Sequence, residues 1–225
     1  MNKKRLWILC IITIITISIV TGKKVKSSFI EIPTFAEEIK ANPTVSYSWH
    51  EDEILRATYP YYSYDINNLN DLEKQSHFIA EVMPIDDGTL VAYATLRKCK
   101  VINTFKGKSI DENIYIYEPN IFMHTDNYIC EQGYISMKKD EKYIVFLKNI
   151  ENSDKVSDEK LRNGYLYTNP TFGKYKLGEK AKLIERNPDK DEMHFNEVID
   201  LPVFLIENEN VEKYNCILGD IEKTY

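Results

Sequence analysis

Residues 97–108 read RKCKVINTFKGK, and this stretch decides the fold that the sequence predicts. Successive side chains of a β-strand point to opposite faces, so Lys98 and Lys100 fall on one face and Cys99 on the other. Gly107 follows where the chain must reverse, because glycine adopts the positive φ that a tight turn requires. The stretch therefore predicts a strand with a wet lysine face and a dry face, followed by a turn.

Similar strand-like runs continue on both sides of this stretch. They are rich in Val, Ile, Tyr, Phe and Thr, and Gly, Asp, Asn and Pro separate them, as is typical of short antiparallel strands. We expect strands in HFIAEVMPI, TLVAYATLRKCKVINTF, ENIYIYEP, YISM and KYIVFL, which begin at His77, Thr89, Glu112, Tyr134 and Lys142. The last run is apolar on both faces, which predicts a strand covered on both sides. Together these runs predict a small antiparallel β-barrel.

Two helices and one extended segment are expected to accompany the barrel. The sequence NDLEKQS predicts a short helix in which Asn70 caps the N-terminus and Glu73 reaches back to it. Near the C-terminus, apolar residues recur at a spacing close to 3.6, at Val211, Tyr214, Leu218 and Ile221. This period predicts a terminal amphipathic helix packed on the barrel. The preceding run EVIDLPVFLI is expected to be one more strand or an extended cover.

The N-terminus carries a membrane signal. Three basic residues are followed by LWILCIITIITISIV, which has no charge, Pro or Gly. As a helix, residues 6–22 would span about 25 Å, slightly less than the ~30 Å hydrocarbon core of a bilayer. This length fits an uncleaved transmembrane anchor or a cleaved signal peptide, and the absence of a clean A-x-A site favours the anchor. The basic flank predicts a cytoplasmic N-terminus, which places the rest of the chain outside.

The length of 225 residues suits one domain with extensions. We expect an anchor or signal over residues 1–26, an irregular extension packed on the barrel over 27–70, the barrel over 71–180, and a covering strand and helix over 181–225. The fold class is therefore mainly β with minor α.

Charge excludes one class of partner. The net charge is −6, although residues 1–26 hold six basic residues and no acidic one, so the remainder is more acidic still. Such a domain repels phosphate backbones, which disfavours general nucleic-acid binding.

The order EKQSHFIAEV, YATLRKCKVINTFKG, IYIYEP, MKKDEKYIVFL and GKYKLG, within about residues 70–178, resembles a family of uncharacterised exported or lipid-anchored proteins of Gram-positive bacteria. It is more distantly similar to the OB-fold module of tissue inhibitors of metalloproteinases. The resemblance implies an OB-like barrel. The inhibitors bind the zinc of their target through an N-terminal cysteine, which this chain lacks near Lys23 and Ser27, so the resemblance does not carry that function over.

Motifs for catalysis and metal binding are incomplete. HEDEI at His50 has Ile54 where a zinc protease needs a second histidine, and HTD at His124 offers too few ligands. The sequence has no G-x-S-x-G, P-loop or G-x-G-x-x-G motif. We therefore expect no catalytic residues, no metal site and no cofactor. Three cysteines lie beyond the apolar segment, and their state stays open between free thiols and one disulfide: Cys99, Cys130 and Cys216.

Two weak candidate binding sites remain. Lys98 and Lys100 form a local basic face that suits an anionic wall polymer. The run TYPYYSY supplies Tyr59, Tyr61 and Tyr62 as an aromatic patch for glycans or a partner, although such runs more often pack on a barrel rim.

The function that these features favour is a non-enzymatic, membrane-tethered extracytoplasmic binding module, which recognises a surface protein or a component of the cell envelope. One alternative is an envelope hydrolase built from loops, with histidines drawn from His50, His77, His124 and His194. Another is a membrane-proximal sensor.

Overall fold

The computed structural model describes residues 34–48, 61–91, 94–108, 112–123, 126–150, 162–185 and 192–225, together with Trp7, Thr13, Ser18 and Thr21. Residues 33–225 form one compact unit and residues 1–32 another. In these described parts, no helix is long and apolar enough to cross a membrane. The anchor predicted over residues 6–22 falls almost wholly outside them and stays a prediction.

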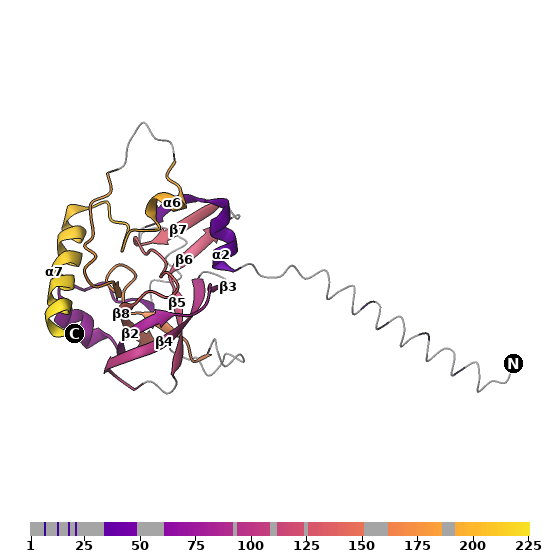
Figure 1. Ribbon diagram of the computed structural model, residues 1–225, viewed down its shortest axis with the longest axis horizontal. Coiled ribbons are helices and arrows are strands. Elements are labelled where there is room, and N and C mark those ends of the chain that lie inside the picture. The colour runs from indigo at the N-terminus through magenta and orange to yellow at the C-terminus, as the bar shows by residue number, and fades with distance from the viewer. Residues whose placement is uncertain are drawn as a thin grey trace. The chain divides into compact units, whose positions relative to one another are not determined.

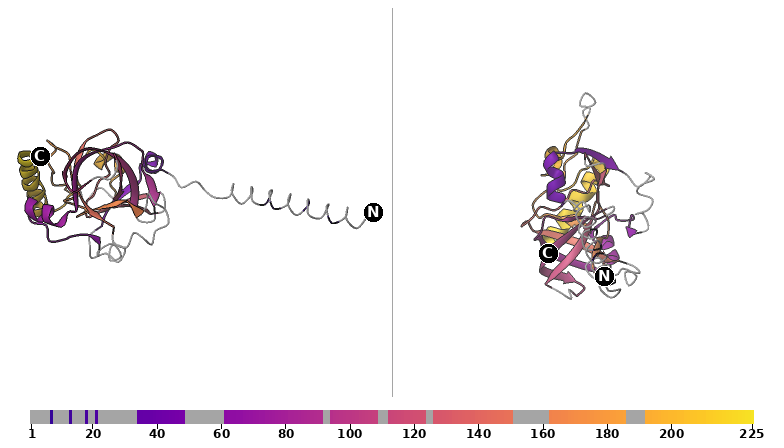
Figure 2. Two further views of the ribbon diagram at one scale, coloured as in Figure 1. Left: turned by 90° about the horizontal axis from the view of Figure 1, so that it is seen from below. Right: turned by 90° about the vertical axis from the view of Figure 1, so that its right-hand side faces the viewer.

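Five strands in the described part of the chain close into a barrel, which confirms the mainly β class (Figure 1; Figure 2, left). The pairing order is β8-β2-β4-β5-β9, and β9 pairs back to β8. The neighbours are antiparallel except β5 and β9, which are parallel. In the order β2, β4, β5, β8 and β9, these strands span Phe78–Pro84, Ala94–Lys106, Asn113–Glu118, Tyr143–Asn149 and Tyr165–Tyr167.

Alternate side chains of these strands fill the barrel. Cys99 of β4 is fully buried beside Ile114 and Ile116 of β5, and Val101 packs against the same cluster. The dry face predicted from the opening stretch is therefore confirmed. Each large apolar side chain buried in this way contributes about 1.5–3 kcal/mol relative to its exposure to water.

Strand β8 is covered on both faces, as its apolar sequence predicts. Ile144 and Phe146 point outward and pack against helix α4, Leu69–Gln75, and helix α7, Asn208–Thr224. Both helices lie outside the barrel, on the side away from α2 (Figures 1 and 2). The terminal helix predicted from its 3.6-residue period is present, with Tyr214, Leu218 and Ile221 buried.

A second, three-stranded sheet in the described chain lies in the order β1-β7-β6. The strands span Thr44–Ser48, Asn127–Glu131 and Asn120–Met123, respectively. Its aromatic cluster contains Phe35 of helix α2, Phe35–Glu38, Tyr128 of β7 and Phe195 of helix α6, Phe195–Val198. The remaining short elements are the 3₁₀ turn η1 and strands β3 and β10, which cover Ile39–Ala41, Thr89–Val91 and Lys174–Tyr175.

Two strand predictions were wrong. The run that begins at Thr89 forms two antiparallel strands, β3 and β4, because the chain reverses between Val91 and Ala94. YISM is irregular rather than a strand: Tyr134 and Met137 pack into the barrel, and the Met137 amide donates to the Glu118 carboxylate.

Two smaller predictions also need correction. Helix α4 is capped by Asn68 rather than Asn70, because the Asn68 side chain accepts a 3.0 Å hydrogen bond from the Asp71 amide. The run EVIDLPVFLI, predicted as a strand or an extended cover, begins inside α6 and continues through turns and bends. In this part of the chain only an isolated bridge joins Leu205 to Leu183.

Candidate functional site

The outer surface of strands β4 and β5 is the best candidate for a binding site. Lys98 lies opposite Tyr115, and Lys100 lies opposite Asn113. These side chains point outward because their neighbours along each strand are buried in the barrel. We call this surface the β4–β5 face, and it consists of the partly exposed residues Lys98, Lys100, Asn113, Tyr115 and Tyr117.

Cations and aromatic rings lie close together on the β4–β5 face. Side chains directly opposite each other on paired strands are about 4.5–5.5 Å apart at Cβ, so Lys98 and Tyr115 are close neighbours across the two strands. The two tyrosines of this face, Tyr115 and Tyr117, are half-buried. The Lys100 ammonium is 3.2 Å from Glu112, but its side chain is 45% exposed, so this ion pair is weak and opens readily to a competing anion.

A buried ion pair lies directly behind this face. Arg97, between Leu96 and Lys98, points into the barrel, and its Nε donates a 2.9 Å hydrogen bond to Glu118. The Glu118 side chain is 0% exposed. Burial alone would lower the pKa of Arg97, but the charge of Glu118 outweighs it and raises the pKa.

Glu118 is held by further donors from another segment. Its Oε1 accepts hydrogen bonds from the Tyr134 hydroxyl, at 2.8 Å, and from the Met137 amide, at 2.7 Å. The Tyr134 hydroxyl also lies 3.0 Å from that of Tyr167. Burial, followed by the charge of Glu118, raises the pKa of both tyrosines, so both stay neutral. With both of its oxygens engaged, Glu118 fixes the strands rather than offering a free base.

Lys174 of β10 adds a second buried cation. The residue is only 4% exposed, and its Nζ donates to the carbonyl of Ile135. The ammonium lies 4.7 Å from the ring centroid of Tyr134 and 5.4 Å from that of Tyr143. Burial lowers the pKa of Lys174 to about 8, and the nearby Glu118 charge opposes this shift.

Sequence reasoning missed this buried cluster, although one signal was available. Arg97 shares the parity of Cys99 along β4, and Glu118 shares the parity of Ile116 along β5. Two opposite charges at inward positions of neighbouring strands indicate a buried ion pair, since an unpaired buried charge is very costly.

The predicted tyrosine patch is not brought to the β4–β5 face. Tyr59 lies outside the described residues, and Tyr61 is 50% exposed. Burial, followed by the charge of Glu131, raises the pKa of Tyr62. The segment runs beside residues 168–169, where the Ser63 amide donates to the Thr168 carbonyl and the Ser63 carbonyl accepts from Asn169.

The described histidines have local structural partners. His77 Nδ1 accepts a 3.1 Å hydrogen bond from the Asn149 amide at the end of β8. His194 is the N-cap of α6, and its Nδ1 lies 3.1 Å from the carbonyl of Asn42. His50 and His124 lie outside the described residues. Among the residues described, no group of three or more His, Cys, Asp or Glu is placed to hold a metal ion, and Cys99, Cys130 and Cys216 are free thiols.

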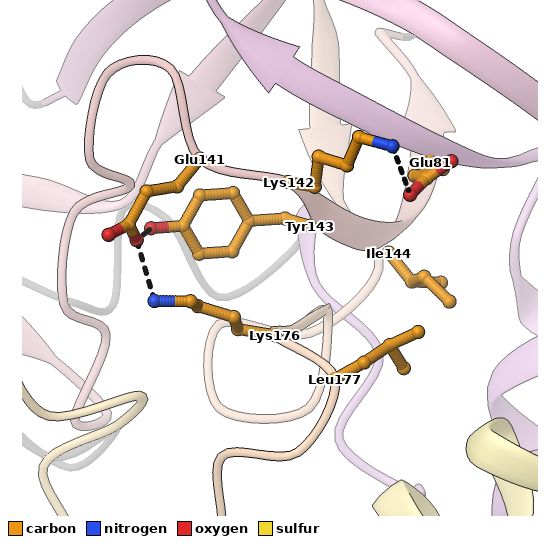
Figure 3. Close-up of a pocket in the computed structure, with 7 residues that line it drawn as sticks. All are labelled: Glu81, Glu141, Lys142, Tyr143, Ile144, Lys176 and Leu177. Carbon is orange, nitrogen blue, oxygen red and sulfur yellow. Dashed lines mark hydrogen bonds and ion pairs between the residues drawn. The ribbon is translucent and has the colours of Figure 1, made fainter.

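A pocket of about 480 Å³ lies on the outer side of β2 and β8 (Figure 3). It is lined by Glu81, Glu141, Lys142, Tyr143, Ile144, Lys176 and Leu177. Glu141 accepts from the Tyr143 hydroxyl and pairs with Lys176 at 3.0 Å, and Lys142 lies 3.5 Å from Glu81. Both acids are thus already neutralised by lysines, which leaves this pocket a weaker candidate than the β4–β5 face.

Comparison of this chain with protein-family models, with curated proteins and with solved structures finds no match in any of the three. The function is therefore inferred from the geometry of the described residues.

Proposed function

We propose that this protein is a membrane-tethered, extracytoplasmic binding module without catalytic activity, and that it binds an anionic polymer of the cell envelope through the β4–β5 face. The observation that carries the proposal is that Lys98 lies opposite Tyr115, and Lys100 opposite Asn113, on one outward surface. A surface protein of the envelope is the alternative partner.

The order in which the strands pair supports an OB-like barrel. Along the chain, β2, β4, β5, β8 and β9 are barrel strands one to five, and strands three and five are parallel neighbours, as in the OB fold. Proteins with this fold bind oligonucleotides and oligosaccharides on the face of strands two and three. The β4–β5 face occupies that position in this barrel. This support is an analogy at the level of the fold.

The chemistry of the face suits a polymer that carries both anionic groups and sugar or polyol units. Lysine ammonium groups attract phosphate or carboxylate, and tyrosine rings present apolar area with a polar tip. Because the chain as a whole is acidic, attraction depends on local cations such as those of this face, and binding is expected to weaken as salt screens it.

The hydrolase and sensor alternatives have less support. His77 and His194 are engaged in different parts of the unit, one at the end of β8 and one at the start of α6. Sensing requires a route from the anchor to the barrel.

A charge-reversal experiment tests the proposal. Full-length protein in detergent is titrated with soluble poly(glycerol phosphate) and, separately, with neutral dextran. The double variant Lys98→Glu/Lys100→Glu should lose at least tenfold in affinity for the polyanion, because each new carboxylate repels it. The matched control is Lys180→Glu/Lys182→Glu, which changes the net charge equally at two exposed positions away from the face. Equal binding by the two double variants would contradict the proposal.

A further inference from the structure

The turn that borders the β4–β5 face, Asp86–Gly88, is held by groups on β4. The Asp86 carboxylate accepts a 3.1 Å hydrogen bond from the Lys98 amide and another from the Gly88 amide. The Asp86 carbonyl accepts from Arg97 Nη1 at 3.1 Å. Lys98 of the binding face is therefore tied, through its own backbone, to the conformation of this turn.

The segment that leads from the N-terminal region into the barrel contacts the same turn. The Phe35 amide donates a 3.1 Å hydrogen bond to the Gly88 carbonyl, and Thr34 forms an antiparallel bridge with Thr89. The chain therefore meets this turn as soon as it enters the compact unit that begins at residue 33. Figure 1 shows α2 beside β3.

The side chain of Phe35 reaches the buried ion pair. Its ring lies 5.2 Å from the guanidinium carbon of Arg97 and is only 4% exposed. It also makes edge contacts with Phe122 and Phe195, at 5.6 and 5.9 Å between ring centroids. A cation over an aromatic face is attracted by it, and most strongly when both groups are desolvated. Withdrawal of Phe35 would thus remove one wall of the Arg97 site.

The start of helix α2 is stabilised by hydrogen bonds within the segment itself. Thr34 and Glu37 form a capping box, in which the Thr34 amide donates to Glu37 at 2.8 Å and the Glu37 amide donates to Thr34 at 3.3 Å. The helix that follows is short, so it gains little stability from its own hydrogen bonds. Its place is determined mainly by Phe35, which makes docking and undocking of this segment a local event.

We propose that Thr34–Glu38 is a latch through which the anchor-proximal chain controls the β4–β5 face. When the latch is docked, Phe35 and Thr34 hold the Asp86–Gly88 turn, and the turn holds Lys98. When it is undocked, the turn and Arg97 lose this support, and Lys98 loses its fixed position. Only the docked state is competent to bind tightly, so the apparent affinity falls with the docked fraction. This inference rests on the proposed function of the face.

An engineered disulfide, called the staple below, tests both the docked and the undocked state of the latch. Residues paired across an antiparallel bridge have Cα atoms about 4.5–5.5 Å apart, within the range that a disulfide requires. Thr34→Cys/Thr89→Cys, made in a Cys216→Ser background, should lock the latch when oxidised and release it when reduced. The oxidised protein should bind poly(glycerol phosphate) at least as tightly as wild type.

The complementary variant is Phe35→Ala, which should weaken binding at least threefold. The oxidised staple should restore the affinity of Phe35→Ala, and reduction should abolish this rescue. Phe204→Ala is the matched control, since Phe204 belongs to the same aromatic cluster and its ring packs on Tyr47. A loss of affinity caused by general destabilisation would appear in both variants and would overturn the latch.

Amide hydrogen exchange gives a second readout that needs no ligand. The amides of Gly88 and Lys98 both donate to Asp86, so they should exchange faster in Phe35→Ala and recover in the oxidised staple. Unchanged exchange together with unchanged binding would refute the latch. If wild type fails to bind the polymer while these amides respond as expected, the proposed function fails and the latch stands as a coupling between the segment and the turn.

Discussion

Strand β4 carries positively charged side chains on both of its faces, and the two faces place them in different environments. Lys98 and Lys100 face outward, where water solvates them and their contacts are weak. Arg97, one residue away, faces inward and is held by Glu118, the Asp86 carbonyl and the Phe35 ring. The difference shows that the desolvated cation of this strand serves the structure, whereas the hydrated ones are left for the binding that we propose. A single shift of register would exchange the two roles.

The largest expected effect is on the inner side. Glu118→Ala leaves Arg97 buried without its partner, so we expect a loss of about 3–5 kcal/mol in the free energy of unfolding. Urea denaturation measures it. Arg97→Met/Glu118→Leu removes both charges and should recover part of this loss, because Arg97 is no longer buried without its partner, while Lys174 and the Met137 amide still lose the Glu118 carboxylate. A double variant as unstable as the single one would contradict the account of the pair.

The second prediction concerns the buried amine of Lys174. Its pKa is about 8 in the folded protein against 10.5 when exposed, so the unfolded chain binds more protons between these values. The Lys174 amine should therefore make a contribution to stability that rises with pH from about 8 towards 9.5, with a slope of at most about 1.4 kcal/mol per pH unit. In the same window the buried Cys99 and Cys130 thiols and the buried tyrosines, whose pKa values burial raises, contribute with the opposite sign because they ionise first in the unfolded chain. The slope due to Lys174 is therefore the difference between the slopes of wild type and Lys174→Met.

Urea denaturation from pH 7 to 9.5 measures this slope. Lys174→Met should remove it, whereas Lys180→Met, at an exposed position, should leave it unchanged. The charged groups that act on Lys174 are Glu118, Glu141, Glu179 and Arg97, and none of them changes in either variant. Equal pH dependence in wild type and Lys174→Met would contradict the contribution of Lys174.

The smallest effect is expected on the outer side. Lys98→Ala and Lys100→Ala should each change the free energy of unfolding by less than about 0.5 kcal/mol, since exposed side chains with weak contacts contribute little. The same urea experiment at neutral pH measures them. A loss approaching that of Glu118→Ala would remove the distinction between the two sides of β4.

Alternation in the sequence was sufficient to predict the barrel strands β2, β4, β5 and β8, the inward position of Cys99 and the outward position of the two lysines, but not the three-residue strand β9. It was insufficient for Arg97, because the pairing of its charge depends on the register that places Glu118 opposite Thr95 on the neighbouring strand. YISM was misread for a related reason. Tyr134 and Met137 of this run are buried inside the barrel, and the Met137 amide donates a hydrogen bond to Glu118, which is distant in sequence.

The site was predictable only in part. Lys98 and Lys100 follow from the period of their own strand, but their neighbours Tyr115 and Tyr117 required the β4–β5 pairing. The tyrosine patch that the sequence predicts, Tyr59, Tyr61 and Tyr62, belongs to a segment whose described part packs beside Thr168. The sequence does not distinguish Asn68 from Asn70 as the N-cap of α4, because both offer the same side chain. Only the path of the preceding chain decides between them.

The central claim is that the β4–β5 face contacts the polymer, and lysine acetylation footprinting tests it most directly. Full-length protein in detergent is acetylated briefly with and without saturating poly(glycerol phosphate), and each lysine is quantified by mass spectrometry. The account predicts that the polymer protects Lys98 and Lys100 severalfold while the exposed Lys180 and Lys182 react as before. Equal protection of all four lysines, or protection of Lys180 and Lys182 alone, would contradict it.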